Sequence, residues 1–176
     1  MKLLSLSSDA LRRALDAAQE TRLLNGRVLL VFLRHPGCIF TSTALTALGQ
    51  ARKEIESFGV TIVLVNLEPD PGCAASQASK FGLDGVVMIS DLERKIYQAA
   101  GMDRAGVLQV ISPRVIWSGM KAFFGGHRQT SMKADPRQLA GVALLDNGNL
   151  ITSQSCSNVA EVPDYLQLVK STFSLP

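Results

Sequence analysis

A run of apolar residues that ends in a tight turn and a cysteine constrains the fold of this chain most. Val28–Leu33 is uninterrupted apolar sequence, the polar segment Arg34-His35-Pro36-Gly37 follows it, and Cys38 comes next. A short apolar run bounded by turn residues predicts a buried β-strand. Directly after Cys38 a helical spacing of apolar residues begins, formed by Ala44, Leu48, Ala51, Ile55 and Phe58. The order strand, turn, cysteine, helix therefore places Cys38 at the N-terminus of a helix.

That position favours the ionised form of Cys38. The first N–H groups of a helix have no intrahelical acceptor, and the helix dipole is positive at this end. A thiol held there ionises more readily, and the thiolate is the nucleophilic form of cysteine. The alternative interpretation is that Cys38 is a small apolar residue that fills a tight turn.

The segments around this stretch predict one α/β domain. Gly59 ends the helix and Val60–Val65 is a second buried-strand pattern, so the two strands and the helix form a βαβ unit with parallel strands and a right-handed crossover. A length of 176 residues suits a single domain, with its core between about residues 23 and 169. The other expected elements are an N-terminal helix at 8–19, helices at 73–81 and 91–100, a strand at 86–89, a hairpin of 141–145 and 150–155 with an Asn-Gly turn, and a C-terminal helix with Pro163 near its start.

Three segments of the chain resemble one protein family. Phe32–Thr41 reads F-L-R-H-P-G-C-I-F-T, which is similar to the F-L-R-x-x-G-C-x-x-C of the peroxiredoxin-like branch of the AhpC/TSA superfamily. Asp91–Gly101 resembles the D-x-x-x-x-x-Y-x-x-x-G segment of the same branch, as do S-P-R-V-x-W from Ser112 and G-H-R from Gly126. The resemblance implies a thioredoxin-like fold, with a central mixed sheet flanked by helices. Residues 102–135 are less regular, and we expect them to form an insertion packed on the core, with a helix that begins at Ser112-Pro113. The resemblance also implies an antioxidant oxidoreductase activity that depends on a thiol.

The second cysteine of the family motif is absent, because Thr41 stands in its place. Thr41 lies about one helical turn after Cys38, so its hydroxyl can donate a hydrogen bond to a Cys38 thiolate. Thr41 and Ser42 are also suited to capping the helix, which we expect to be the main role of Thr41. In the standard peroxiredoxin pattern a Thr or Ser precedes the peroxide-reacting cysteine by three residues, whereas here the order is reversed.

Nearby cations are candidates to support a Cys38 thiolate. Arg34 and His35 lie just before the turn, and alternation along a strand points them to opposite faces, so only one of them is expected to act. The alternative is that both belong to a solvated strand end. Arg128, beside His127 in the insertion, either closes over the site or lies in an exposed loop.

The remaining cysteines and one alanine bear on the mechanism. Cys73 or Cys156 could pair with Cys38 only if the Cα atoms lie within about 7 Å, and we expect both to be inert. Thioredoxin-like sites usually have a cis-proline just before the strand that begins here at Gly141, but Ala140 occupies that position. Since that proline shapes the substrate groove, its replacement argues against a general disulfide reductase.

Composition excludes several other classes of function. The net charge is +3 with acidic and basic residues interspersed, which favours neither nucleic acid nor a membrane surface as a partner. No apolar run approaches the roughly 18 residues of a membrane span, and the N-terminal apolar stretch is too short for a signal peptide, so a cytoplasmic protein is expected. With 3 cysteines, no C-x-x-C and 2 histidines without ligand spacing, neither a disulfide framework nor a metal site is expected, and no cofactor is implied.

Two hypotheses follow. In the first, the chain is a one-cysteine peroxidase or thiol oxidoreductase, in which Cys38 attacks a peroxide or disulfide and an external thiol, glutathione or a thioredoxin-type protein, reduces it again. In the second, it is a non-catalytic thioredoxin-fold module that has lost its redox couple and serves binding or assembly. Oligomeric state is left open between a monomer and a homodimer.

Overall fold

The structure is a computed structural model that describes residues 2–3, 8–34, 38–102, 138–158 and 160–173. Within these ranges a 6-stranded sheet has the strand order β1-β6-β5-β2-β3-β4. The strands are β1 (Lys2–Leu3), β2 (Arg27–Phe32), β3 (Val60–Asn66), β4 (Val87–Ser90), β5 (Gly141–Asp146) and β6 (Asn149–Ser155). The helices are α1 (Ser8–Ala17), α2 (Ile39–Ser57), α3 (Pro71–Ser79), α4 (Lys95–Ala99) and α7 (Tyr165–Phe173), with a 3-10 helix η1 at Thr21–Leu24.

The central strand of the sheet is β2, the strand that precedes Cys38. It pairs in parallel with β3 on one side and antiparallel with β5 on the other. Helix α2 connects β2 to β3, so the predicted βαβ unit is confirmed. The sheet is mixed, as expected, because β4 continues the parallel half while β5, β6 and β1 form the antiparallel half.

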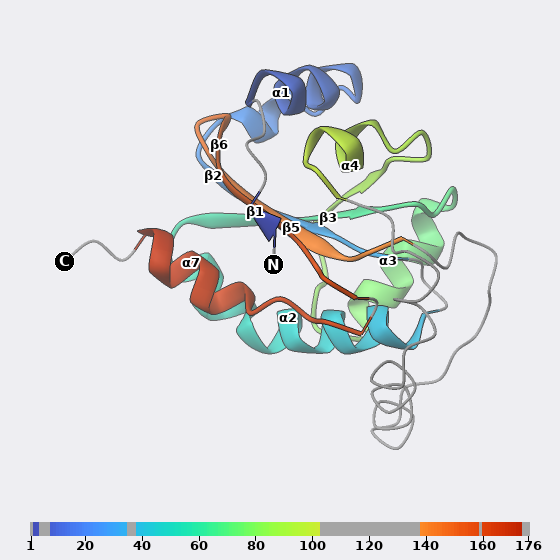
Figure 1. The fold of residues 1–176 in the computed structure, drawn as a ribbon. Coiled ribbons are helices and arrows are strands. Elements are labelled where there is room, and N and C mark those ends of the chain that lie inside the picture. Colours follow the sequence, from blue (N-terminus) through green and yellow to red (C-terminus); the bar gives the residue numbers. More distant parts are fainter. Residues whose placement is uncertain (1, 4–7, 35–37, 103–137, 159, 174–176) are drawn as a thin grey trace.

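Helices cover both faces of the sheet (Figure 1). Helices α1 and α4 lie on one face, and α2 and α7 lie on the other. Successive residues of β2 serve the two faces in turn: Leu29 and Val31 join the core cluster under α2 and α7, whereas Leu30 and Phe32 join the one under α1 and α4. The predicted α/β architecture, with a central sheet flanked by helices, is therefore confirmed.

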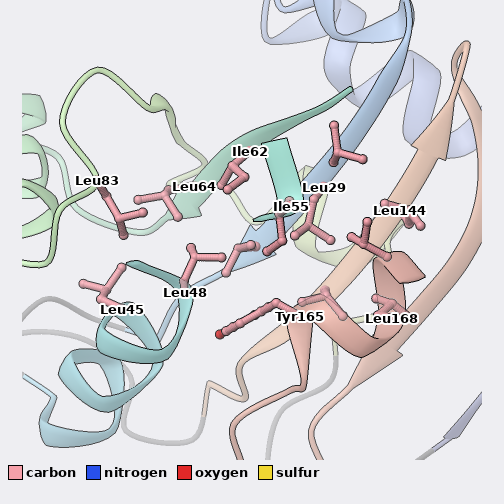
Figure 2. Close-up of a cluster of buried hydrophobic side chains, with 14 of the residues drawn as sticks. Leu29, Leu45, Leu48, Ile55, Ile62, Leu64, Leu83, Leu144, Tyr165 and Leu168 are labelled. Atoms are coloured by element: carbon pink, nitrogen blue, oxygen red, sulfur yellow. The ribbon is translucent and has the colours of Figure 1, made fainter. Parts of the chain in front are cut away.

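The core under α2 and α7 fixes the helix that carries the candidate site. Figure 2 shows Leu45, Leu48 and Ile55 of α2 beside strand residues such as Leu29 and Leu64. Each of these side chains is at most 1% exposed. Burying one leucine or isoleucine side chain stabilises the fold by about 1.5–3 kcal/mol relative to leaving it in water, so this contact holds α2 firmly on the sheet.

The C-terminal hairpin forms with the turn that the sequence predicts. Asn147 and Gly148 both have positive φ values, +49° and +74°, as a two-residue type I′ turn requires. The turn is also tied to the segment before β2: the Asn147 N–H donates to the Gly26 carbonyl, and the Gly26 N–H donates to Asn147 Oδ1. These bonds fix the hairpin against the central strand.

Several predicted boundaries are wrong by a few residues. Helix α3 begins at Pro71 rather than Cys73, because the Asp70 carboxylate caps it by accepting the Gly72 N–H. Helix α4 covers only Lys95–Ala99, because Arg94 has a left-handed backbone at φ +59° and separates the helix from Asp91. Helix α1 ends before Gln19, whose φ is +60°. The short strand β1, which pairs with the end of β6, was not predicted.

Two further findings concern the chain as a whole. The expected insertion at 102–135, including the helix from Ser112-Pro113, lies outside the described residues apart from Met102. Among the helices that the structure describes, none is both long enough and apolar enough to cross a membrane.

Candidate functional site

Cys38 lies where the sequence predicts it, at the start of a long helix. Its backbone is extended, with φ −84° and ψ 128°, and it is the N-cap of the 19-residue helix α2. The Cys38 carbonyl accepts the Ser42 N–H at 3.2 Å, the first turn of that helix. The side chain is 5% exposed. The thiol therefore lies at the positive end of the α2 dipole and almost out of contact with solvent.

Arg34 pairs directly with this thiol. Its Nη1 donates to Cys38 Sγ at 2.8 Å, and its Nε donates to the backbone carbonyl of Gln138 at 2.7 Å. The guanidinium carbon lies 5.8 Å from the centre of the Phe40 ring, and the Arg34 side chain is 4% exposed. The alternative of a solvated strand end is thus wrong for Arg34. A buried guanidinium needs hydrogen-bond acceptors, and the Gln138 carbonyl and the Cys38 sulfur supply two of them.

Thr41 is buried in the first turn of α2, but it neither caps the helix nor hydrogen-bonds to Cys38. Because α2 begins directly after Cys38, Thr41 lies inside the first turn, past the capping position, so the expected capping role is wrong. Its side chain is 2% exposed, and Oγ1 has no hydrogen-bond partner in the described part of the chain. Thr41 lines a small pocket together with Arg34, Phe40, Ala44, Ala140, Glu161 and Leu33.

Cys156 is hydrogen-bonded through its backbone to Ala140 and has the character of an inert thiol. Its N–H donates to the Ala140 carbonyl at 3.0 Å, and its Sγ donates to the Glu161 carbonyl at 3.4 Å. Burial raises the pKa of the Cys156 thiol to about 12, and the Glu161 carboxylate acts in the same direction against the opposing charge of Arg34. This thiol stays protonated at neutral pH.

Glu161 brings a carboxylate to the pocket that Arg34 and Thr41 line. Partial burial by itself would raise the pKa of Glu161, but hydrogen bonds from the hydroxyl and the N–H of Ser157 outweigh it and hold this pKa below its usual range. The Glu161 carboxylate is therefore charged at neutral pH.

Of the other residues singled out in the sequence, the structure describes Cys73 and Ala140. Cys73 is exposed in the first half of α3. His35 and Arg128 lie outside the described residues. Ala140 is 8% exposed, and no peptide bond in the described ranges is cis, so the backbone before β5 lacks the cis-proline geometry.

Tyr97 contacts the end of the central strand, next to Arg34, and the sequence did not predict this contact. The Tyr97 hydroxyl donates to the carbonyl oxygens of Leu33 and Val65, the latter at 2.9 Å. Burial is the main cause that raises the pKa of Tyr97 well above its usual range, and the Asp91 carboxylate adds to it. The phenol therefore remains a neutral donor. The D-x-x-x-x-x-Y spacing marked this segment, but a contact between Tyr97 and the end of β2 is not visible in a linear pattern.

The described residues contain no group of three or more His, Cys, Asp and Glu side chains that could hold a metal ion. What they bring together is a thiol, a guanidinium and a hydroxyl, the groups needed to generate a thiolate and to bind a small polar molecule beside it.

Comparison with solved structures identifies the fold. The bacterioferritin comigratory protein of Xanthomonas campestris superimposes on this chain with a TM-score of 0.58 at 13% sequence identity. The superposition covers 88% of this chain and 82% of that protein. A secreted disulfide oxidoreductase of Mycobacterium tuberculosis gives a TM-score of 0.51 at 16% identity over 88% and 87% of the two chains. The 2-Cys peroxiredoxin of Plasmodium vivax gives 0.52 at 14% identity, covering 84% of this chain and 64% of that one.

These likenesses define the class: the chain has a thioredoxin-like fold, and its structural neighbours are peroxiredoxins and thiol-disulfide oxidoreductases. At such low identity they establish the fold and no more. No family model and no curated protein sequence matches the chain.

Proposed function

We propose that this chain is a thiol-dependent redox protein, a one-cysteine peroxidase or thiol oxidoreductase in which Cys38 is the nucleophile. The observation that carries the proposal is the 2.8 Å hydrogen bond from Arg34 Nη1 to Cys38 Sγ at the N-terminus of α2. Two independent features, the helix dipole and a buried guanidinium, favour the thiolate at the same atom. The structural neighbours, named as peroxiredoxins and oxidoreductases, support the same class of chemistry.

The reaction begins when the Cys38 thiolate attacks one oxygen of a peroxide, ROOH. The S–O bond forms while the O–O bond breaks, and RO⁻ leaves with the electron pair and takes up a proton to become an alcohol or water. Cys38 is oxidised to the sulfenic acid. Arg34 donates a hydrogen bond to the sulfur before attack, and the Thr41 hydroxyl, which has no hydrogen-bond partner in the described part of the chain, donates to a peroxide oxygen.

An external thiol completes the cycle. A first thiol condenses with the sulfenic acid to give a mixed disulfide on Cys38 and water, and a second thiol releases the Cys38 thiolate as the two external sulfurs join. Glutathione or a thioredoxin-type protein is the expected reductant. Thr41 cannot supply the second sulfur, and the raised pKa of Cys156 makes it a poor nucleophile.

Peroxide consumption in the presence of glutathione or thioredoxin tests this function. We expect turnover in the wild-type protein, its loss in Cys38→Ser, and its retention in Cys73→Ser, which removes an exposed thiol instead of a buried one. Mass spectrometry after one equivalent of peroxide should find a sulfenic acid or a mixed disulfide on Cys38. A Cys38–Cys156 or Cys38–Cys73 disulfide as the main product would overturn the one-cysteine mechanism.

One observation favours the second candidate, a thioredoxin-fold binding or assembly module. Cys38 is only 5% exposed, as a cysteine that merely fills the turn would be. The same experiment separates the candidates: a binding module would leave Cys38 reduced after peroxide treatment and show no turnover with either reductant.

A further inference from the structure

Tyr97 carries a buried hydroxyl that the proposed reaction does not use. The side chain is 0% exposed, and its ring packs edge-on against Phe32, with the ring centres 5.0 Å apart. The hydroxyl reaches out of α4 to the end of the central strand, where it donates to the Leu33 and Val65 carbonyls. A phenol has one proton to donate, and the Leu33 contact is the shorter of the two.

The Leu33 carbonyl belongs to the peptide unit that leads into Arg34. Strand β2 ends at Phe32, and the Leu33 N–H still continues the parallel ladder by donating to the Val65 carbonyl at 2.9 Å. At its carbonyl, Leu33 is held by Tyr97. A peptide unit is planar, so fixing the Leu33 carbonyl fixes the direction of the Arg34 N–H and limits where the Arg34 Cα–Cβ bond can point.

Arg34 makes two contacts that depend on that direction. Its Nε and Nη1 donate to the Gln138 carbonyl and to Cys38 Sγ at the same time, at 2.7 and 2.8 Å. The planar guanidinium must hold one orientation to reach both acceptors. A rotation of the peptide before Arg34 would displace the far end of this long side chain and break at least one of the two bonds.

Tyr97 is itself fixed from the other side by Asp91. The Asp91 carboxylate accepts the N–H groups of Lys95, Ile96 and Tyr97 at 2.8–2.9 Å and is 7% exposed. The Asp91 N–H in turn donates to the Asn66 carbonyl at the end of β3. The phenol is therefore held by a capped helix turn that is anchored to the same sheet.

We propose that Tyr97 is a positioning residue for Cys38, which acts by fixing the Leu33–Arg34 peptide so that the Arg34 guanidinium meets the thiolate. The inference rests on the proposed role of Cys38 as nucleophile. It assigns the hydroxyl of Tyr97, and not merely its ring, to the site.

A double-mutant cycle tests this role. Tyr97→Phe keeps the ring and removes the hydroxyl, and Arg34→Met removes the group through which Tyr97 acts. The rate at which iodoacetamide alkylates Cys38 at pH 7, resolved by mass spectrometry, should fall about three- to tenfold in Tyr97→Phe, the size of one lost hydrogen bond. In the Arg34→Met background, Tyr97→Phe should cause no further fall. Tyr165→Phe, the same change at a fully buried tyrosine of the other core cluster, is the matched control and should leave the rate unchanged.

A second measurement reports on Arg34 directly. Hydrogen exchange of the Arg34 Nε–H, followed by NMR, should quicken several-fold in Tyr97→Phe, because the bond to the Gln138 carbonyl loosens. Asp91→Asn, which loosens the cap that holds Tyr97, should change exchange in the same direction to a smaller extent.

The proposal is overturned if Tyr97→Phe slows alkylation equally with and without Arg34, which would mean a general effect on stability or access. Unchanged alkylation, or unchanged Nε exchange in both variants, would also overturn it. Peroxide turnover of the wild-type protein is measured in parallel. Its absence would count against the proposed function, while the Nε exchange still decides whether Tyr97 positions Arg34.

Discussion

Arg34 is the residue that turns a buried cysteine into a candidate site. An arginine that is 4% exposed requires hydrogen-bond acceptors, and in the structure it donates to one carbonyl oxygen and one sulfur. A thiolate at that sulfur would also supply the negative charge that a buried guanidinium needs. The pairing therefore stabilises both partners when Cys38 is ionised.

Arg34→Met should slow alkylation of Cys38 at pH 7 by about tenfold or more, because the variant keeps the length of the side chain and loses its charge. Alkylation kinetics with site-resolved mass spectrometry measure this change. Arg27→Met is the matched control: Arg27 lies at the opposite end of β2, donates to the Phe58 carbonyl and stacks on Phe173. An equal effect of the two substitutions would mean that the pairing with sulfur has no influence on reactivity.

Thr41→Val should separate stability from catalysis. Removing a buried hydroxyl that has no hydrogen-bond partner among the described residues should leave the free energy of unfolding unchanged or raise it by up to about 1 kcal/mol, as urea titration would show. Peroxide turnover should fall about tenfold, because the donor to the peroxide is lost, while alkylation of Cys38 stays the same. Thr41→Ser keeps the hydroxyl and should retain turnover. Full peroxide activity in Thr41→Val would remove Thr41 from the mechanism.

At this scale the sequence predicted the position of Cys38 at the helix N-terminus and the nearness of Arg34, but not the contacts that Arg34 makes. Cys38 and Arg34 were identified because a strand, a turn and a helix follow each other locally. The partner that orients Arg34, the Gln138 carbonyl, lies 104 residues further along the chain. A backbone oxygen at that separation leaves no signal in the sequence. Neither does the lack of a hydrogen-bond partner for Thr41 Oγ1 in the part of the chain that the structure describes.

At the scale of elements, the two aspartates that cap helices differ in burial and in the number of bonds they accept. Asp91 is buried and accepts three N–H groups at the start of α4, whereas Asp70 is exposed and accepts the Gly72 N–H at the start of α3. A five-residue helix such as α4 has almost no stability of its own, so its cap and its packing must hold it in place.

Asp91→Ala should therefore lower the free energy of unfolding by about 2–3 kcal/mol, against about 0.5–1 kcal/mol for Asp70→Ala. Urea denaturation followed by circular dichroism would give both values. Similar losses in the two variants would mean that α4 does not depend on the buried carboxylate.

Element types were predicted well because each has a local signal. The Asn147-Gly148 pair predicted the hairpin. Two apolar runs on either side of a helical spacing of apolar residues predicted the βαβ unit. The boundaries of α4 could not be predicted, since Asp91 suits a cap and nothing in the sequence marks the left-handed backbone of Arg94. Strand β1 was missed because two residues are too few to show alternation.

At the scale of the whole molecule, the fold buries one thiol and two phenol groups that carry a proton at neutral pH. Burial raises the pKa of Cys156 from 9.0 to about 12, and it raises the pKa of Tyr97 and of Tyr165 as well. Such groups keep their protons in the folded state, while the unfolded chain releases them at their ordinary pKa values. Stability is therefore intact below about pH 9 and declines as the pH rises toward 12, since the unfolded state then binds fewer protons than the folded one.

Each of these groups should lower the free energy of unfolding by up to about 1.4 kcal/mol per pH unit within its own range. Urea titrations at pH 8, 9, 10 and 11 should show this decline, and Cys156→Ala should decline less steeply above pH 9. Cys73→Ala, at an exposed thiol, is the control and should follow the wild-type profile. A profile that stays flat up to pH 11 would contradict the burial of these groups.

The place of β2 in the sheet has a consequence for the newly made chain. One edge of β2 pairs with β3, which follows soon after it in the chain. The other edge pairs with β5, residues 141–146, which is synthesised much later. At typical rates of protein synthesis, the 104 residues between Arg34 and Gln138 take roughly 5–20 seconds to emerge. Until then the central strand presents an open apolar edge, and the guanidinium lacks the carbonyl that aims it at sulfur. During this interval the nascent protein exposes an unpaired strand edge to which other chains can add, and Arg34 lacks one of the two acceptors that orient it in the folded protein.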